Sequence, residues 1–115
     1  MSNSIEGIGL ERFDHVGIAV PDLAVATDFF VDVLGFEKAY VIGPIEAGRE
    51  WLSENLGCGC AARVTIQVLN MPGGKVELFE FSPKPEGHHP RRDDLGSASL
   101  GLKVRDLDRS VERLR

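Results

Sequence analysis

The sequence predicts an α+β fold built from a duplicated βαβββ module, and an internal repeat is the main support for it. The stretch from His15 to Leu23 (HVGIAVPDL) returns as Ser99 to Leu107 (SLGLKVRDL), with a glycine, a valine, an aspartate and a leucine in register. In both copies a strand-like pattern is followed by a helix-like pattern. Repetition of a whole supersecondary unit indicates duplication. The repeat also isolates one chemical difference, because the first copy begins with a histidine and the second with a serine.

The first strand and helix follow from residue periodicity. Strict alternation from Phe13 to Val20 predicts a strand with an aliphatic face for the core and a face of small residues that carries His15. Asp22 is placed to cap the next element, and apolar residues at helical spacing predict a helix over 23–34. Gly35 then ends the helix, because glycine readily adopts positive φ past the last turn. The small residues around His15 leave room for a ligand.

Three further strands complete the first module. They are expected at Glu37 to Ile42, Arg63 to Asn70 and Lys75 to Phe81. The last two are joined through a Pro-Gly-Gly turn, which predicts antiparallel pairing. Residues 43–61 are expected to form a long loop with one helical turn near Trp51, and loops of this length within a compact domain are often functional.

The repeat divides the chain into three parts: the first module at 13–81, a linker at 82–96, and the start of a second module at 97–115. In the third part we expect a strand over 97–104 and then a helix from Leu107. The second module therefore has only its strand and helix.

The second copy stops inside a helix that Asp106 is placed to cap. A curled sheet left uncovered there would expose strand edges and apolar surface. We therefore expect the natural protein to continue past Arg115, with dimerisation as the alternative way to cover that surface.

Composition limits the classes of function. The chain has 115 residues, 43% hydrophobic and 27% charged, which predicts one globular domain. A net charge of -5 argues against a nucleic-acid partner, and no apolar run approaches the roughly 20 residues that span a bilayer. The N-terminus lacks the basic start and apolar core of a signal peptide. We expect a cytoplasmic protein in which Cys58 and Cys60 are reduced.

Three motifs resemble the vicinal oxygen chelate superfamily: FDHVGIAVPDL from Phe13, FFVDVLGF from Phe29 and VELFE from Val76. That superfamily includes glyoxalase I, methylmalonyl-CoA epimerase, extradiol dioxygenases, fosfomycin-modifying enzymes and bleomycin-resistance proteins. The resemblance covers nearly the whole chain from Phe13 and is specific for the fold rather than for one activity. It implies paired βαβββ modules that form a curled mixed sheet around a cleft, with the second module incomplete here.

The resemblance also implies a metal site. Metal-dependent members hold one divalent ion with ligands from the first and last strands of each module. These positions fall on His15 and Glu77 in the first module, on Ser99 in the second, and beyond Arg115 for the fourth. An imidazole nitrogen and a carboxylate oxygen suit Zn, Ni, Co, Mn or Fe in a partly open site.

Two ligands leave alternatives open. A third is expected from His88 or His89, or from the partner subunit of a homodimer, although the two histidines also fit a solvated linker. The first hypothesis is a metal-dependent lyase or isomerase acting on a small oxygenated substrate, with Glu77 also a candidate base. The alternative is a metal-free small-molecule binding protein of the bleomycin-resistance type, in which His15 only hydrogen-bonds Glu77; a third option is a structural role alone. Candidate pocket residues are Trp51, Phe79, Phe81 and Ser99, together with Tyr40.

Overall fold

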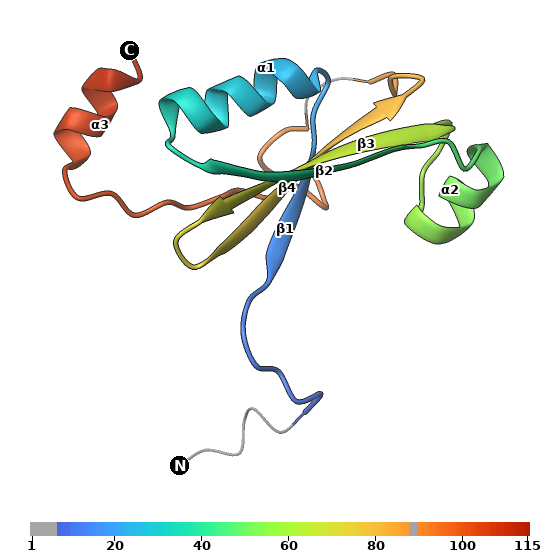
Figure 1. The fold of residues 1–115 in the computed structure, drawn as a ribbon, viewed down its shortest axis with the longest axis horizontal. Helices are drawn as coiled ribbons and strands as arrows, with labels where there is room; N and C mark the ends of the chain where they lie inside the picture. The colour runs from blue at the N-terminus through green and yellow to red at the C-terminus, as the bar shows by residue number, and fades with distance from the viewer. Residues whose placement is uncertain (1–6, 88–89) are drawn as a thin grey trace.

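The computed structural model describes residues 7–87 and 90–115, and it confirms an α+β fold with one βαβββ module (Figure 1). The four strands form one mixed sheet in the order β1-β4-β3-β2. The elements in chain order are β1 (His15–Ala19), α1 (Leu23–Asp28), η1 (Phe29–Val33), β2 (Glu37–Ile45), α2 (Arg49–Leu56), β3 (Arg63–Met71), β4 (Gly74–Ser82) and α3 (Leu107–Arg113).

The pairing of the sheet brings the first strand beside the last. β1 runs parallel to β4, with His15 opposite Lys75 and Gly17 opposite Glu77. β4 pairs antiparallel with β3 through the tight turn after Met71, as the sequence predicted, and β3 pairs antiparallel with β2. Two parallel neighbouring strands need a long crossover connection. Here the chain from α1 to β3, which lies between β1 and β4 in the sequence, forms that connection.

One face of the sheet is covered by α1 and η1 (Figure 1). Alternate residues of β4 are fully buried under it, as period-two patterning predicts. The aliphatic face of β1 packs into the same cluster. The buried members of this cluster are Phe36, Leu69, Val76 and Leu78.

The opposite face has a second apolar cluster toward the end that carries α2. Leu52 of α2 is fully buried against β3, and Phe79 and Phe81 of β4 pack against the cluster while remaining partly accessible. The part of this face nearest β1 carries the exposed residues His15 and Gly17. Apolar side chains therefore cover this face of the sheet unevenly, and the part that carries His15 is left exposed.

Local signals set the ends of the first helix. The Asp22 side chain accepts a hydrogen bond from the Val25 backbone N–H at 3.0 Å, so the predicted cap is confirmed. From Phe29 the helix continues as a π-helical turn, in which the Leu34 N–H reaches the Phe29 carbonyl at 3.2 Å. Gly35 follows with φ of 83°, as expected for a glycine past the last turn.

The segment 43–61 is more ordered than predicted. β2 extends to Ile45, and α2 covers Arg49–Leu56 rather than one turn. Gly57 ends α2 at φ of 70°, a left-handed conformation that glycine adopts without strain. The long-loop prediction was wrong because the burial of Leu52 against β3 stabilises a helix that the sequence pattern only weakly indicates.

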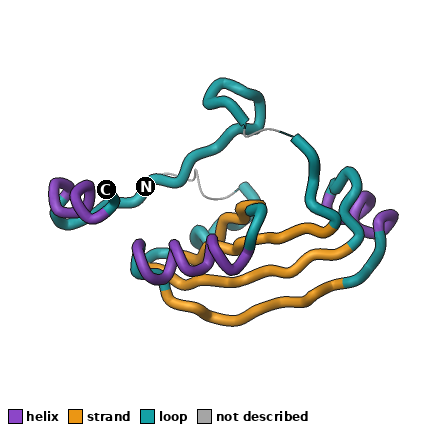
Figure 2. Tube along the Cα trace, turned by 90° about the horizontal axis from the view of Figure 1, so that it is seen from above, coloured by secondary structure: helices purple, strands orange, loops and turns teal. Residues whose placement is uncertain are grey.

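The predicted strand over 97–104 is wrong for the described structure. These residues are extended but pair with no described strand, and Figure 2 shows the segment running outside the sheet toward α3. A strand requires a hydrogen-bonded neighbour. The predicted helix is present as α3, and Asp106 caps it by accepting from the Arg109 N–H at 3.0 Å.

A groove of about 550 Å³ separates this C-terminal segment from the first module. It is lined mainly by apolar side chains from the end of η1, the β3–β4 turn and α3. Arg113 of α3 donates a hydrogen bond across it to the Asp32 carbonyl at 3.4 Å. The groove does not include His15 or Glu77.

Candidate functional site

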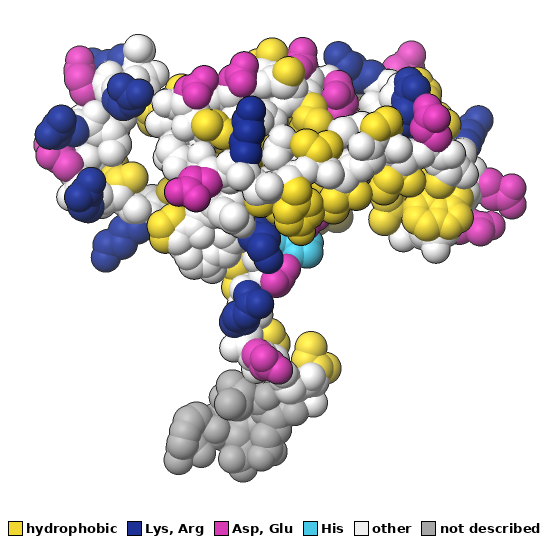
Figure 3. Space-filling model, in the orientation of Figure 1, with side chains coloured by type: hydrophobic (Ala, Val, Ile, Leu, Met, Phe, Trp, Pro, Cys, Tyr) yellow, Lys and Arg dark blue, Asp and Glu magenta, His cyan; other side chains and the backbone are white. Residues whose placement is uncertain are grey.

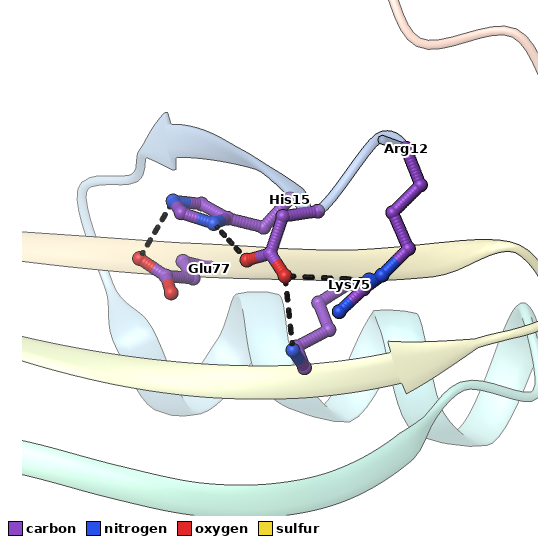
Figure 4. Close-up of polar contacts among 5 residues, drawn as sticks. Arg12, His15, Lys75 and Glu77 are labelled. Atoms are coloured by element: carbon purple, nitrogen blue, oxygen red, sulfur yellow. Dashed lines mark hydrogen bonds and ion pairs between the residues drawn. The ribbon is translucent and has the colours of Figure 1, made fainter. Parts of the chain in front are cut away.

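The structure brings the two predicted ligands together. His15 begins β1 and Glu77 lies within β4, and the parallel register places them diagonally on one face. The distance from His15 Nε2 to Glu77 Oε1 is 3.5 Å (Figure 4). The Glu77 side chain is 16% exposed and that of His15 is 42% exposed. The carboxylate is therefore less exposed than the imidazole.

A second carboxylate contacts the other side of the ring. Asp14 Oδ2 lies 2.8 Å from His15 Nδ1. Asp14 Oδ1 faces two cations, Lys75 Nζ at 3.6 Å and an Arg12 guanidinium nitrogen at 3.5 Å. The hydrogen bond with His15, followed by the charge of Lys75, holds the pKa of Asp14 below its usual value. The result is a continuous polar chain from Arg12 and Lys75 through Asp14 and His15 to Glu77.

An aromatic pair borders this polar chain. Phe79 and Phe81 are stacked, with ring centroids 5.9 Å apart and planes inclined by 17°. Phe79 also lies over Gly17, because a Cβ built on that glycine would be only 2.9 Å from the ring. Figure 3 shows the histidine where a band of apolar side chains meets the charged side chains of the N-terminal segment. A ligand at this border would meet polar and aromatic groups together.

The remaining predicted pocket residues lie elsewhere. Trp51 is an exposed side chain of α2, at the far end of the sheet from β1 (Figure 1). Tyr40 is two strands from Glu77, since both pair with Val68 of β3. Ser99 lies in the extended C-terminal segment, where its hydroxyl accepts a hydrogen bond from Arg92 at 3.4 Å. His88 and His89, expected as possible third ligands, lie outside the described residues.

The donor atoms that meet here fit part of a divalent-metal site. Nε2 of His15 is the ring nitrogen that faces Glu77, and Nδ1 is already occupied by Asp14. A nitrogen and an oxygen at this separation can bind one ion from the same side. Within residues 7–87 and 90–115 no group of three or more His, Cys, Asp or Glu side chains is arranged to hold a metal. The described chain thus offers two direct ligands.

Comparison with known proteins identifies the family. The family model described as "Glyoxalase/Bleomycin resistance protein/Dioxygenase superfamily" matches residues 14–115. This chain belongs to that superfamily. The resemblance noted in the sequence is therefore confirmed.

Two curated relatives are epimerases. The chain is 37% identical over 109 residues to a 2-epi-5-epi-valiolone epimerase of Actinomyces, and this match covers 93% of the chain and 59% of that protein. The chain is also 30% identical over 103 residues to the mitochondrial methylmalonyl-CoA epimerase of Mus musculus, and this match covers 85% of the chain and 55% of that protein. The chain thus spans less than two thirds of the length of either epimerase.

Solved structures show the same fold. A glyoxalase family protein from Bacillus cereus superposes with a TM-score of 0.65 at 27% identity, covering 91% of this chain and 70% of that one. The fosfomycin resistance protein FosX from Listeria monocytogenes, solved with Mn(II) and a dihydroxypropylphosphonic acid, gives a TM-score of 0.51 at 16% identity, covering 88% and 66%. At that identity the second likeness shows the fold alone.

Asp14 belongs to the site but was not among the residues predicted from the sequence. Neighbouring residues on a strand point to opposite faces, so Asp14 was counted with the core-facing positions. β1 begins only at His15, however, and Asp14 lies just before it. The signal available in the sequence was that Arg12, Asp14 and Lys75 are all charged. The alternation of apolar and polar residues along a strand does not explain these charges.

Proposed function

We propose that this chain carries part of a divalent-metal site and serves an isomerase of the epimerase type. The observation that carries the proposal is the approach of His15 Nε2 and Glu77 Oε1 to 3.5 Å on an accessible face. A relative with 37% identity that is named an epimerase supports the reaction class. A small oxygenated substrate fits the mixed polar and aromatic border of the site.

His15 and Glu77 would hold the metal, with Zn, Ni, Co, Mn and Fe all compatible with one nitrogen and one carboxylate ligand. When bound, such an ion polarises a substrate carbonyl and so acidifies the neighbouring C–H bond. Two ligands from the described residues leave further coordination positions of the metal open. We propose that a partner subunit in a homodimer, or further protein beyond this chain, supplies them.

Glu77 is also the candidate base. Epimerisation next to a carbonyl breaks one C–H bond, whose electron pair delocalises toward the carbonyl oxygen while the carboxylate takes the proton. A water molecule on the opposite face donates a proton to the carbon and so inverts the centre, and Glu77 releases the proton that it took to solvent. The reaction needs no oxidant or reductant. Glu77 suits this role because its side chain is 16% exposed on the face that carries His15, so a substrate bound there can reach the carboxylate.

The metal half of the proposal is tested by metal content and binding. We expect protein purified without chelator to retain a divalent ion that His15→Ala and Glu77→Gln lose. Glu80→Gln is the matched control, because Glu80 is on the same strand but faces the other side of the sheet. Retention of the same stoichiometric metal by His15→Ala would contradict the proposal.

The reaction half is tested by deuterium incorporation. Methylmalonyl-CoA and 2-epi-5-epi-valiolone, the compounds named for the two relatives, are incubated with the protein in D2O and analysed by mass spectrometry. We expect one of them to gain a single deuterium, and Glu77→Gln to abolish the gain. Exchange at the wild-type rate by Glu77→Gln would exclude Glu77 as the base.

The stacked pair of Phe79 and Phe81 favours a second candidate, a metal-free protein that binds a small aromatic compound. In that case His15 and Glu77 only interact with each other. The two candidates differ in their response to chelator. Thermal stabilisation by an aromatic ligand that is unchanged by EDTA and lost in Phe79→Ala would favour the binding protein.

A further inference from the structure

We propose that Asp14 is a positioning residue that fixes the ring of His15 and directs Nε2 toward Glu77. The inference rests on the metal site proposed above, and it concerns a residue outside the predicted ligand set. The Lys75 N–H donates to the Asp14 carbonyl at 3.1 Å, so Asp14 is attached to β4 although it precedes β1.

The two carboxylate oxygens of Asp14 have different partners. Oδ1 faces Lys75 Nζ at 3.6 Å and Arg12 at 3.5 Å, and Oδ2 faces His15 Nδ1 at 2.8 Å. Because both cations gather at one oxygen, the other is turned toward the imidazole (Figure 4). The Asp14 side chain, which is 53% exposed, thus contacts the two cations through one oxygen and the imidazole through the other.

This contact determines which ring nitrogen carries the proton. An ionised carboxylate only accepts hydrogen bonds, so Nδ1 of a neutral His15 must be the protonated nitrogen. Nε2 then presents its lone pair to Glu77 Oε1 at 3.5 Å. Two electron-rich atoms that face each other at this distance suit a cation between them. A carboxylate behind a metal-binding histidine fixes its tautomer and raises its basicity, and loss of such a group costs about 10–100-fold in metal affinity.

The internal repeat is consistent with this pairing. The residue that corresponds to His15 in the second copy is Ser99, and the residue that corresponds to Asp14 is Ala98. The copy without the histidine therefore also lacks the carboxylate.

The first experiment measures the tautomer directly and needs no metal. Long-range ¹H–¹⁵N correlation spectra of the ¹⁵N-labelled chain are recorded with EDTA, at alkaline pH where the ring carries one proton. We expect the wild-type His15 signals of an Nδ1–H tautomer and, in Asp14→Ala, a shift toward Nε2–H. An Nε2–H tautomer in the wild type would overturn the inference.

The second experiment measures affinity for the metal alone by calorimetric titration with Mn²⁺ and Zn²⁺. We expect Asp14→Asn and Asp14→Ala to weaken binding about 10–100-fold. Asp28→Asn, which removes an exposed carboxylate of α1, is the control for net charge and should bind like the wild type. Equal affinity of wild type and Asp14→Ala would overturn the inference. If the wild type binds neither ion, the proposed metal site is wrong, and the ring spectrum alone decides the role of Asp14.

Discussion

The two copies of the internal repeat have nearly the same pattern but different structures. In the first copy the strand half pairs with β4 and its aliphatic residues enter the core. In the second copy the corresponding residues 99–104 are extended and unpaired within the described structure, and Leu102 is 40% exposed. The helix halves agree closely, with Asp22 and Asp106 each accepting from the backbone N–H three residues later at 3.0 Å.

The difference separates local from non-local causes of structure. A cap is formed by residues three apart, so the same residues reproduce it wherever the segment lies. A strand exists only where a neighbour completes its hydrogen bonds. The first copy has β4 as that neighbour, and the second copy has none among the described residues. Paired substitutions at corresponding positions can therefore measure how much the tertiary context contributes.

Truncation of the corresponding residues Ile18 and Leu102 should show the largest contrast. Ile18→Ala removes a side chain that packs into the core cluster and should lower the free energy of unfolding by about 2–4 kcal/mol. Leu102→Ala removes a partly exposed one from the second copy and should cost under about 1 kcal/mol. Urea denaturation followed by circular dichroism measures both. Similar losses would mean that the second copy is packed as tightly as the first.

Substitution of the two repeat glycines should give an intermediate contrast. A Cβ at Gly17 would meet the Phe79 ring at 2.9 Å, whereas a Cβ at Gly101 has nothing within 4 Å. Gly17→Ala should therefore destabilise by about 1–3 kcal/mol and displace the Phe79 ring, while Gly101→Ala should be close to neutral. Thermal unfolding and the aromatic ¹H chemical shifts of Phe79 report the two effects. An unmoved Phe79 signal in Gly17→Ala would contradict the close approach.

Removal of the two helix caps should change stability less. The effect should be global for Asp22 and local to α3 for Asp106. Asp22→Ala should lower global stability by about 1 kcal/mol, because α1 is part of the core. Asp106→Ala should increase amide exchange within α3 and leave global unfolding unchanged, since α3 has no buried residue and borders the groove. Hydrogen exchange and urea denaturation together distinguish the outcomes. A global loss in Asp106→Ala would show that α3 unfolds together with the sheet.

The pH dependence of Asp14 should be the smallest effect and has no counterpart in the second copy. The pKa of Asp14 is lowered in the folded protein, first by the His15 hydrogen bond. Its stabilising contribution is therefore present above the unfolded value of about 3.9 and lost as pH falls below it. With EDTA present, the stability difference between wild type and Asp14→Asn should shrink from neutral pH to below about pH 4. A difference that stays constant across this range would show that Asp14 ionises alike in both states.

Most of the first module could be predicted because its signals are periodic. Alternation located β1, β3 and β4, and the aspartate caps located two helices. α2 was underestimated because its helix depends on the burial of Leu52 against β3, whereas the pattern in residues 43–61 indicates only one helical turn. The strand over 97–104 was overestimated because its sequence has the required pattern but none of the described strands pairs with it.

The site was partly predictable. The meeting of His15 with Glu77 follows from family resemblance together with the parallel pairing of β1 and β4. The place of Phe79 depends on the lack of a side chain at Gly17, a contact between strands that the sequence does not specify. Asp14 was missed because strand alternation assigns it to the wrong face, although it lies before the strand begins.

The parallel pairing of β1 with β4 has a consequence for the order of folding. The β3–β4 hairpin closes through a turn of a few residues, whereas β1 can dock only after most of the module has been synthesised and folded back. His15 and Glu77 meet only when β1 has paired with β4. An ion that binds both side chains would therefore bind only molecules in which this pairing has formed, and its occupancy would report the fraction of such molecules in a population.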